Sequence, residues 1–129
     1  MILDGAHNPA GARALRRYVE RFYSGRKLWL VYGAMRDKAV EEIAEILFPL
    51  ASELILTAPA VPRAVRPEVL RELAGTGRIA PDFASAMNIV NAEVTADDVV
   101  IITGSLFLIG EARRAYSRCR GQLWDSVVS

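Results

Sequence analysis

Short apolar runs alternate with longer amphipathic segments along this chain, and this alternation restricts its fold more than any other feature. The runs typical of buried strands are 2–3, 28–32, 54–57 and 98–102, with a short edge strand expected at 78–80. The segments between them carry apolar residues at steps of three and four, which is the period of a helix. The alternation predicts an α/β protein, a three-layer α/β/α sandwich with a mostly parallel sheet and right-handed crossovers.

Proline, glycine and small polar residues mark the expected helix ends. Asn8 suits the N-cap of the first helix, and Asp37 is expected to cap the second. The short helix that starts at Pro67 is expected to turn three apolar side chains inward: Val69, Leu70 and Leu73. The remaining expectations are a last strand at 98–102, a last helix at 107–118 and a tail without a packing pattern from residue 121.

All turns that lead from a strand into a helix lie on one edge of a parallel sheet, at the carboxyl ends of the strands, where such folds bind ligands. This chain places polar residues there in four turns: 4–8, 33–38, 57–63 and 103–105. The turns hold an acid, a histidine, basic side chains and hydroxyls, and helix N-termini add partial positive charge. We therefore expect a site for a polar, anionic ligand at this edge.

Two of these turns carry the candidate site residues. Asp4 and His7, the chain's one histidine, stand in the first turn, and Ser105 ends the last. Each turn also has a purely structural interpretation, in which Ser105 is simply the N-cap of the last helix. Ser105 lies outside a Gly-x-Ser-x-Gly turn and only one histidine is present, which disfavours a hydrolase triad.

Composition and missing motifs argue against several classes of protein. A net charge of +1 gives no support for nucleic-acid binding, and one cysteine with one histidine disfavours a zinc site. The chain has neither a Gly-x-x-x-x-Gly-Lys-Ser/Thr loop nor a Gly-x-Gly-x-x-Gly motif. No apolar run reaches the roughly 18 residues of a membrane span. We expect one cytoplasmic domain over residues 1–129 and, because the chain opens directly into a strand, a piece of a longer protein.

Four motifs occur in the order typical of one enzyme family. They are Leu-Asp-Gly-Ala-His-Asn-Pro at 3–9, Tyr-Gly-Ala-Met-Arg-Asp-Lys at 32–38, Pro-Arg-Ala at 62–64 and Thr-Gly-Ser-Leu-Phe-Leu-Ile-Gly-Glu at 103–111. The chain up to about Arg114 thereby resembles the C-terminal domain of folylpolyglutamate synthases and dihydrofolate synthases, within the Mur ligase superfamily. The resemblance implies the Rossmann-like fold of that domain.

The same resemblance implies part of an ATP-dependent amide ligase. In this family ATP and Mg²⁺ phosphorylate a carboxylate of dihydropteroate or a folate, and the amino group of glutamate then attacks the acyl phosphate. The P-loop and the Mg²⁺ ligands belong to an N-terminal partner domain, so this chain would hold neither a metal ligand nor a complete catalytic set. Transferred by position, Asp4 would contact the nucleotide, and His7 and Ser105 would bind glutamate.

Two other interpretations stay open on the sequence. The Ala-His-Asn-Pro core at 6–9 also suits another Mur-type ligase, such as a muramyl peptide synthetase, although the motif at 103–108 favours a folate enzyme. The other is a stand-alone α/β ligand-binding module without chemistry. As part of a ligase, the isolated chain is expected to be inactive, with small-molecule substrates and neither nucleic acid nor membrane as a partner.

Overall fold

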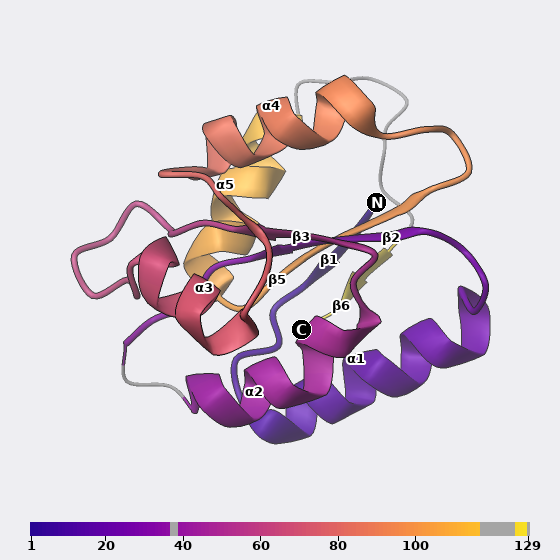
Figure 1. Ribbon diagram of the computed structural model, residues 1–129, viewed down its shortest axis with the longest axis horizontal. Helices are drawn as coiled ribbons and strands as arrows, with labels where there is room; N and C mark the ends of the chain where they lie inside the picture. The colour runs from indigo at the N-terminus through magenta and orange to yellow at the C-terminus, as the bar shows by residue number, and fades with distance from the viewer. Residues whose placement is uncertain (37–38, 117–125, 129) are drawn as a thin grey trace.

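A parallel sheet of six strands runs through the centre of the protein in the order β4-β3-β2-β5-β1-β6 (Figure 1). The computed structural model describes residues 1–36, 39–116 and 126–128. The strands are β1 (Ile2–Asp4), β2 (Leu28–Tyr32), β3 (Glu53–Leu56), β4 (Arg78–Ile79), β5 (Val99–Thr103) and β6 (Ser126–Val128). Every pair of neighbouring strands is parallel, so the predicted parallel sheet is confirmed.

Helices cover both faces of the sheet and complete the predicted three layers. They are α1 (Pro9–Phe22), α2 (Val40–Leu47) followed by the 3-10 turn η1 (Phe48–Leu50), α3 (Pro67–Ala74), α4 (Phe83–Glu93) and α5 (Leu106–Tyr116). One buried core joins α1, α2 and α3 to the sheet, and a second core joins α4 and α5 to its other face. In Figure 1, α1 and α2 lie below the sheet and α4 lies above it. No helix in the described part of the chain is long and apolar enough to span a membrane.

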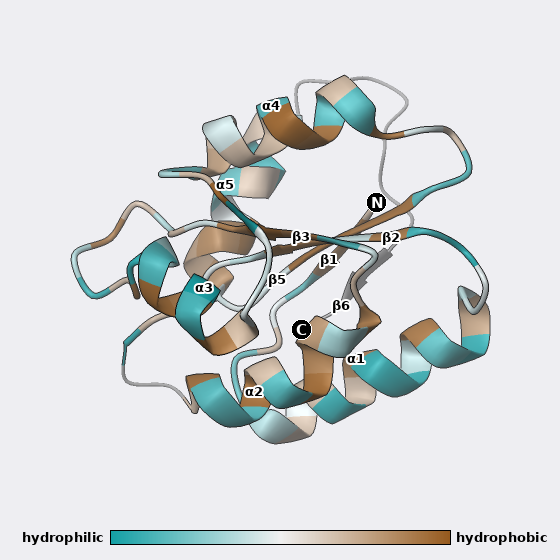
Figure 2. Ribbon diagram, viewed as in Figure 1, coloured by the Kyte–Doolittle hydropathy of each residue, from teal (hydrophilic) through white to brown (hydrophobic). Residues whose placement is uncertain are grey.

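The central strands are apolar throughout because both of their faces are covered. All five residues of β2 are buried. Alternate residues enter different cores: Leu30 and Tyr32 pack with α1–α3, and Val31 packs with α4 and α5. This is the two-residue period of a strand. Figure 2 shows the result, with hydrophobic strands at the centre and many hydrophilic positions on the surrounding helices.

The helix ends confirm some of the predicted caps and correct another. Oδ1 of Asn8 accepts a hydrogen bond from the Gly11 amide at 2.7 Å, and Gly75 ends α3 with a left-handed φ of 73°. The predicted cap position of α2 is corrected: the helix begins at Val40, and Ala39 is its cap residue. Asp37 itself lies outside the described residues.

Two apolar residues of α3 lie on its surface, which corrects the prediction for that helix. Leu70 is buried as expected, but Val69 is 39% exposed and Leu73 is 42% exposed. Val69 and Leu73 are four positions apart, so they share one side of the helix. That side borders a cavity between α3 and α2, whereas Leu70 packs on the sheet. A helical period identifies the apolar stripe, but it does not show how far the neighbouring helix stands from it.

β6 lies at the edge of the sheet beside β1, where the sequence predicts only a tail. Ile2 is the register partner of Ser126, and Asp4 is the partner of Val128. β6 offers only two consecutive valines, a run too short for periodicity to distinguish from a tail. The expected last strand is therefore the fifth, and α5 ends at Tyr116, before residues 117–125, which lie outside the description.

Candidate functional site

The carboxyl ends of the strands bring the candidate residues to one edge, as the parallel topology predicts. In the sheet register Asp4 of β1 is the partner of Thr103 of β5, and Thr103 is the partner of Tyr32 of β2. These buried polar side chains form a row across three neighbouring strands. The chain leaves β1 into the turn that holds His7 and leaves β5 into the turn that holds Ser105, so both turns stand at this edge.

Asp4 is a buried carboxylate that organises its own turn. The residue is 3% exposed, and its Oδ1 accepts a hydrogen bond from the Ala6 amide at 2.8 Å. Burial raises the pKa of Asp4 because desolvation disfavours the charged form, while the bond from Ala6 acts in the opposite direction. Since a carboxylate has several acceptor positions, Asp4 can also accept a hydrogen bond from a hydroxyl or amino group of a ligand.

We expect Asp4→Asn to stabilise the protein at neutral pH. Asparagine keeps an oxygen for the Ala6 amide and removes the buried charge. Because folding raises the pKa of Asp4, the wild-type carboxyl favours folding below its ordinary value of 3.8 and loses this contribution as the pH rises through the folded pKa. Urea unfolding of both proteins from acid to neutral pH should show an advantage of the variant that grows with pH. An advantage that does not change with pH would contradict this account.

His7 stands on the outer part of the same turn. Its ring is half-buried, and Nδ1 lies 2.8 Å from the carbonyl oxygen of Gly5. Because a carbonyl oxygen only accepts, this contact is a hydrogen bond when Nδ1 carries the proton, and Nε2 is then the nitrogen that can meet a ligand. The turn therefore orients the imidazole through its inner nitrogen.

Ser105 is fixed by the helix that follows it. The residue is 1% exposed, and its Oγ accepts a hydrogen bond from the Phe107 amide at 3.1 Å. Its carbonyl accepts a bond from the Ile109 amide at 3.1 Å, so the predicted N-cap of α5 is confirmed. A serine hydroxyl that accepts one bond still has its own proton to donate. Capping the helix and donating to a ligand oxygen are thus compatible roles.

Gly104 sets the direction of the turn before Ser105. Its φ is 110°, a conformation that L side chains rarely adopt. A Cβ atom at this position would overlap the carbonyl oxygen of Gly33 and would lie 2.8 Å from Cε1 of Tyr32. The turn therefore packs directly against the end of β2, an approach that only glycine permits.

Tyr32 and Thr57 place two more buried hydroxyls at this edge, beside Thr103. The sequence did not predict either of them as a site residue. All three residues are fully buried, and within the described residues none of the three hydroxyls has a hydrogen-bond partner. The signal in the sequence is a hydroxyl residue that ends an apolar run. A buried hydroxyl without a partner lowers the stability of the fold by about 1–3 kcal/mol. Proteins tolerate such destabilising groups mainly at functional sites.

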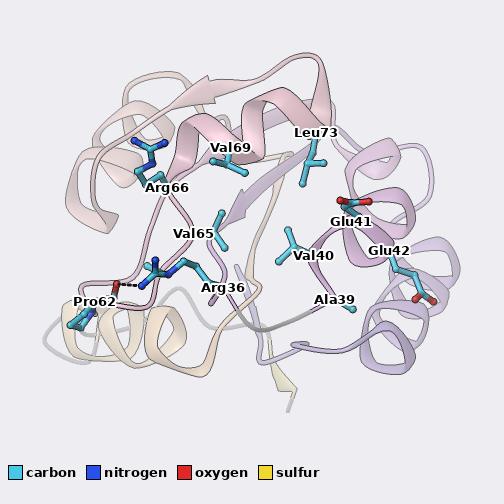
Figure 3. A pocket seen from close by; sticks show the side chains of 11 residues that line it. Arg36, Ala39, Val40, Glu41, Glu42, Pro62, Val65, Arg66, Val69 and Leu73 are labelled. Atoms are coloured by element: carbon cyan, nitrogen blue, oxygen red, sulfur yellow. Dashed lines mark hydrogen bonds between the residues drawn. The ribbon is translucent and has the colours of Figure 1, made fainter.

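A cavity of about 880 Å³ lies between α2 and α3 (Figure 3). Its lining combines apolar side chains with two arginines: Val40, Val65, Val69, Leu73, Arg36 and Arg66. Nη2 of Arg36 donates a hydrogen bond to the carbonyl oxygen of Pro62 at 3.3 Å, which Figure 3 shows at the side opposite Val40. Asp4, His7 and Ser105 do not line this cavity, so the predicted site residues belong to the sheet edge and not to the groove between the helices.

The family comparison agrees with this fold. A family model described as Mur ligase, glutamate ligase domain, matches residues 1–106. A probable bifunctional folylpolyglutamate synthase/dihydropteroate synthase of Halobacterium salinarum is 37% identical over 123 residues, which are 92% of this chain and 15% of that protein.

Two solved structures have the same fold over most of this chain. Mycobacterium tuberculosis folylpolyglutamate synthase complexed with ADP and AMPPCP matches with a TM-score of 0.77 and 30% identity, over 87% of this chain and 28% of that one. A bifunctional folylpolyglutamate synthase/dihydrofolate synthase with Mn, AMPPNP and L-glutamate bound matches with a TM-score of 0.80 and 27% identity, over 88% of this chain and 28% of that one. The chain thus spans less than a third of the length of each of these relatives.

Proposed function

Because this chain belongs to the Mur ligase, glutamate ligase domain family, we propose that it is the C-terminal domain of an ATP-dependent ligase of the folylpolyglutamate synthase/dihydrofolate synthase type. The whole enzyme adds L-glutamate to dihydropteroate or to a folate. The observation that carries the proposal is the meeting of three groups at one sheet edge: a buried carboxylate, an oriented histidine and a capping serine. Such a ligase acts on small molecules in the cytoplasm.

The proposed reaction has two steps. The γ-phosphoryl group of ATP passes to the substrate carboxylate, which gives an acyl phosphate and ADP. The amino group of glutamate then attacks the acyl carbon, phosphate leaves, and loss of a proton completes the amide. The ligands named for the relatives, AMPPCP in one and Mn, AMPPNP and L-glutamate in the other, support this choice of substrates. We assign Mg²⁺ and the P-loop to a separate N-terminal domain, because this chain covers only 15% and 28% of two of its relatives and its sequence contains no Gly-x-x-x-x-Gly-Lys-Ser/Thr loop.

We assign Asp4 to the nucleotide. A buried carboxylate repels phosphates but accepts hydrogen bonds from hydroxyl and amino groups, so its partner is the ribose or the base and not the triphosphate. Asp4 lies at the end of β1, and its partner Thr103 leads into the turn of Ser105. The nucleotide and the glutamate would therefore meet along one edge of the sheet.

We assign His7 and Ser105 to glutamate. Nε2 of His7 and the hydroxyl proton of Ser105 can both bond a charged substrate, while the Gly5 carbonyl and the Phe107 amide hold the two side chains in place. Their contribution is to orient the glutamate amine toward the acyl phosphate, which is catalysis by positioning and not by nucleophilic attack.

Because the P-loop is assigned to a separate N-terminal domain, we expect this chain to fold by itself but to catalyse no reaction by itself. Its two cores are complete, whereas the P-loop motif is absent from its sequence. We expect ATP-dependent glutamate ligation from the full-length protein, measured as ADP release that requires glutamate and dihydropteroate or folate, and none from residues 1–129. Ligation by the purified chain would contradict the assignment, and a full-length protein without ligation would remove the proposed function.

In the full-length protein we expect Asp4→Ala to raise the KM for ATP by about tenfold, the effect of losing one hydrogen bond to a charged group, with a smaller change in the KM for glutamate. Alanine also removes the bond to the Ala6 amide, so the variant will be less stable for that reason alone. Asp4→Asn is the matched control because it keeps that bond. If only turn order matters, Asp4→Asn will bind ATP as the wild type does, and the nucleotide role is wrong.

A further inference from the structure

We propose that Tyr32 is a positioning residue for Ser105 and that its ring acts through the Gly104 turn. This inference rests on the proposed function, because Ser105 is assigned there to glutamate. Tyr32 ends β2 and is fully buried. Its side chain is the largest of the row that it forms with Thr103 and Asp4.

The first step of the argument is the close approach of the turn to the ring. A Cβ on Gly104 would lie 2.8 Å from Cε1 of Tyr32, closer than real Cβ atoms come, and 3.0 Å from Cδ1, tighter than nine in ten real Cβ contacts. The ring edge is therefore in direct packing contact with the backbone of the turn. On its other flank the turn meets the end of β2, where the Gly33 amide donates a hydrogen bond to the Thr103 carbonyl at 3.3 Å. The ring and the end of β2 together limit where the backbone can go after Thr103.

The second step is that the ring itself is held firmly. Tyr32 packs edge-on against Phe48, with ring centroids 5.1 Å apart and an interplanar angle of 80°. Phe48 belongs to η1, directly after α2, and lies against the core under α1–α3. Movement of the Tyr32 ring toward the core would displace Phe48. The Tyr32 ring is therefore packed between Phe48 and the Gly104 turn, and it restricts movement of that turn.

The third step separates the ring from its hydroxyl. Among the described residues the Tyr32 hydroxyl has no hydrogen-bond partner, so its loss removes no bond that the structure shows. Ser105, in contrast, depends on the backbone before it, because its Oγ must reach the Phe107 amide at 3.1 Å to cap α5. The size of the Tyr32 ring, and not its hydroxyl group, thus determines the position of the Ser105 hydroxyl.

The test compares Tyr32→Phe and Tyr32→Leu in the full-length protein, with Leu70→Ala as a control for general loss of core packing. Leu70 is buried in the same core but lies on α3, distant in sequence from the turn. We expect Tyr32→Leu to lower kcat/KM for glutamate by about ten- to a hundredfold, because misplacement of a positioning group has effects of this size. Its KM for ATP should change by less than about threefold, since no ribose or base contact is lost. Tyr32→Phe should keep kcat/KM for glutamate near the wild-type value. Leu70→Ala should lower the melting temperature without changing kcat/KM for glutamate.

A second measurement on residues 1–129 keeps the inference independent of the ligase assignment. The α-hydrogen of Gly104 that takes the Cβ direction points at the Tyr32 ring, so its NMR shift should carry a ring-current contribution that Tyr32→Phe keeps and Tyr32→Leu removes. Exchange of the Phe107 amide should accelerate in Tyr32→Leu, whereas the Ser85 amide, which bonds Asp82 Oδ1 at 2.8 Å, should be unchanged. Unaltered Gly104 and Phe107 signals in Tyr32→Leu would overturn the inference even if no ligation is found. Altered signals with an unaltered kcat/KM for glutamate would overturn it as well, and would leave the proposed function intact.

Discussion

Replacing Gly104 by alanine is expected to cost about 3 kcal/mol or more of unfolding free energy, combining backbone strain with overpacking. The φ of 110° already disfavours any side chain, and the new methyl group would overlap the Gly33 carbonyl oxygen. β5 and β2 would have to separate at their carboxyl ends to relieve the overlap. Urea unfolding monitored by circular dichroism gives the difference in free energy between the variant and the wild type.

Gly75→Ala is the matched control for this prediction. Gly75 also has a positive φ, 73°, but nothing lies within 4 Å of the position that its Cβ would take. Its replacement should cost about 1 kcal/mol, the strain of a left-handed residue alone. Equal losses in the two variants would mean that the contact with β2 contributes nothing and that backbone conformation is the whole effect.

Each of the substitutions His7→Ala and Ser105→Ala is expected to lower kcat/KM for glutamate in the full-length protein by roughly ten- to a hundredfold. The range corresponds to about 1.5–3 kcal/mol for one hydrogen bond to a charged group. ATP affinity should be nearly unchanged, because neither residue is assigned to the nucleotide. Steady-state kinetics with glutamate varied at saturating ATP, and then the reverse, measures both effects.

The double variant and a control serine sharpen the same experiment. His7 and Ser105 would hold one ligand, so the double variant should lose less than the product of the two single losses. Ser52→Ala is the matched control, since Oγ of Ser52 accepts a bond from the Leu28 amide at 2.9 Å, at the opposite edge of the sheet. It should reduce stability and leave glutamate kinetics unchanged. Unchanged glutamate kinetics in both single variants would leave only the capping and turn roles.

Much of the fold could be predicted because its signals are local. The apolar run of β2 and the Asn8–Pro9 start of α1 each depend on a few adjacent residues, and the structure has both. The common edge of the turns followed from parallel topology alone, since every strand of such a sheet points the same way. The placement of Asp4, His7 and Ser105 at that edge could therefore be predicted from the sequence alone.

The features that escaped prediction depend on distances between elements. Val69 and Leu73 have the spacing of a buried stripe, yet they are exposed because α2 does not close over them. The contact between Tyr32 and Gly104 requires the register of β2 with β5, which a single sequence does not specify. The ligand roles of Asp4, His7 and Ser105 stay predictions, because they concern molecules that bind from outside the chain.

The strand order has a consequence for how the protein is made. β1, which holds Asp4, is inserted between β5 and β6, the last two strands in the sequence. During synthesis the first turn therefore emerges from the ribosome long before its neighbours in the sheet exist. Contacts between such distant segments close large loops and form late and slowly. The nascent domain must carry an unpaired Ile2–Asp4 segment until almost all of it has been translated, so we expect the ligand edge to be the last part of the domain to form.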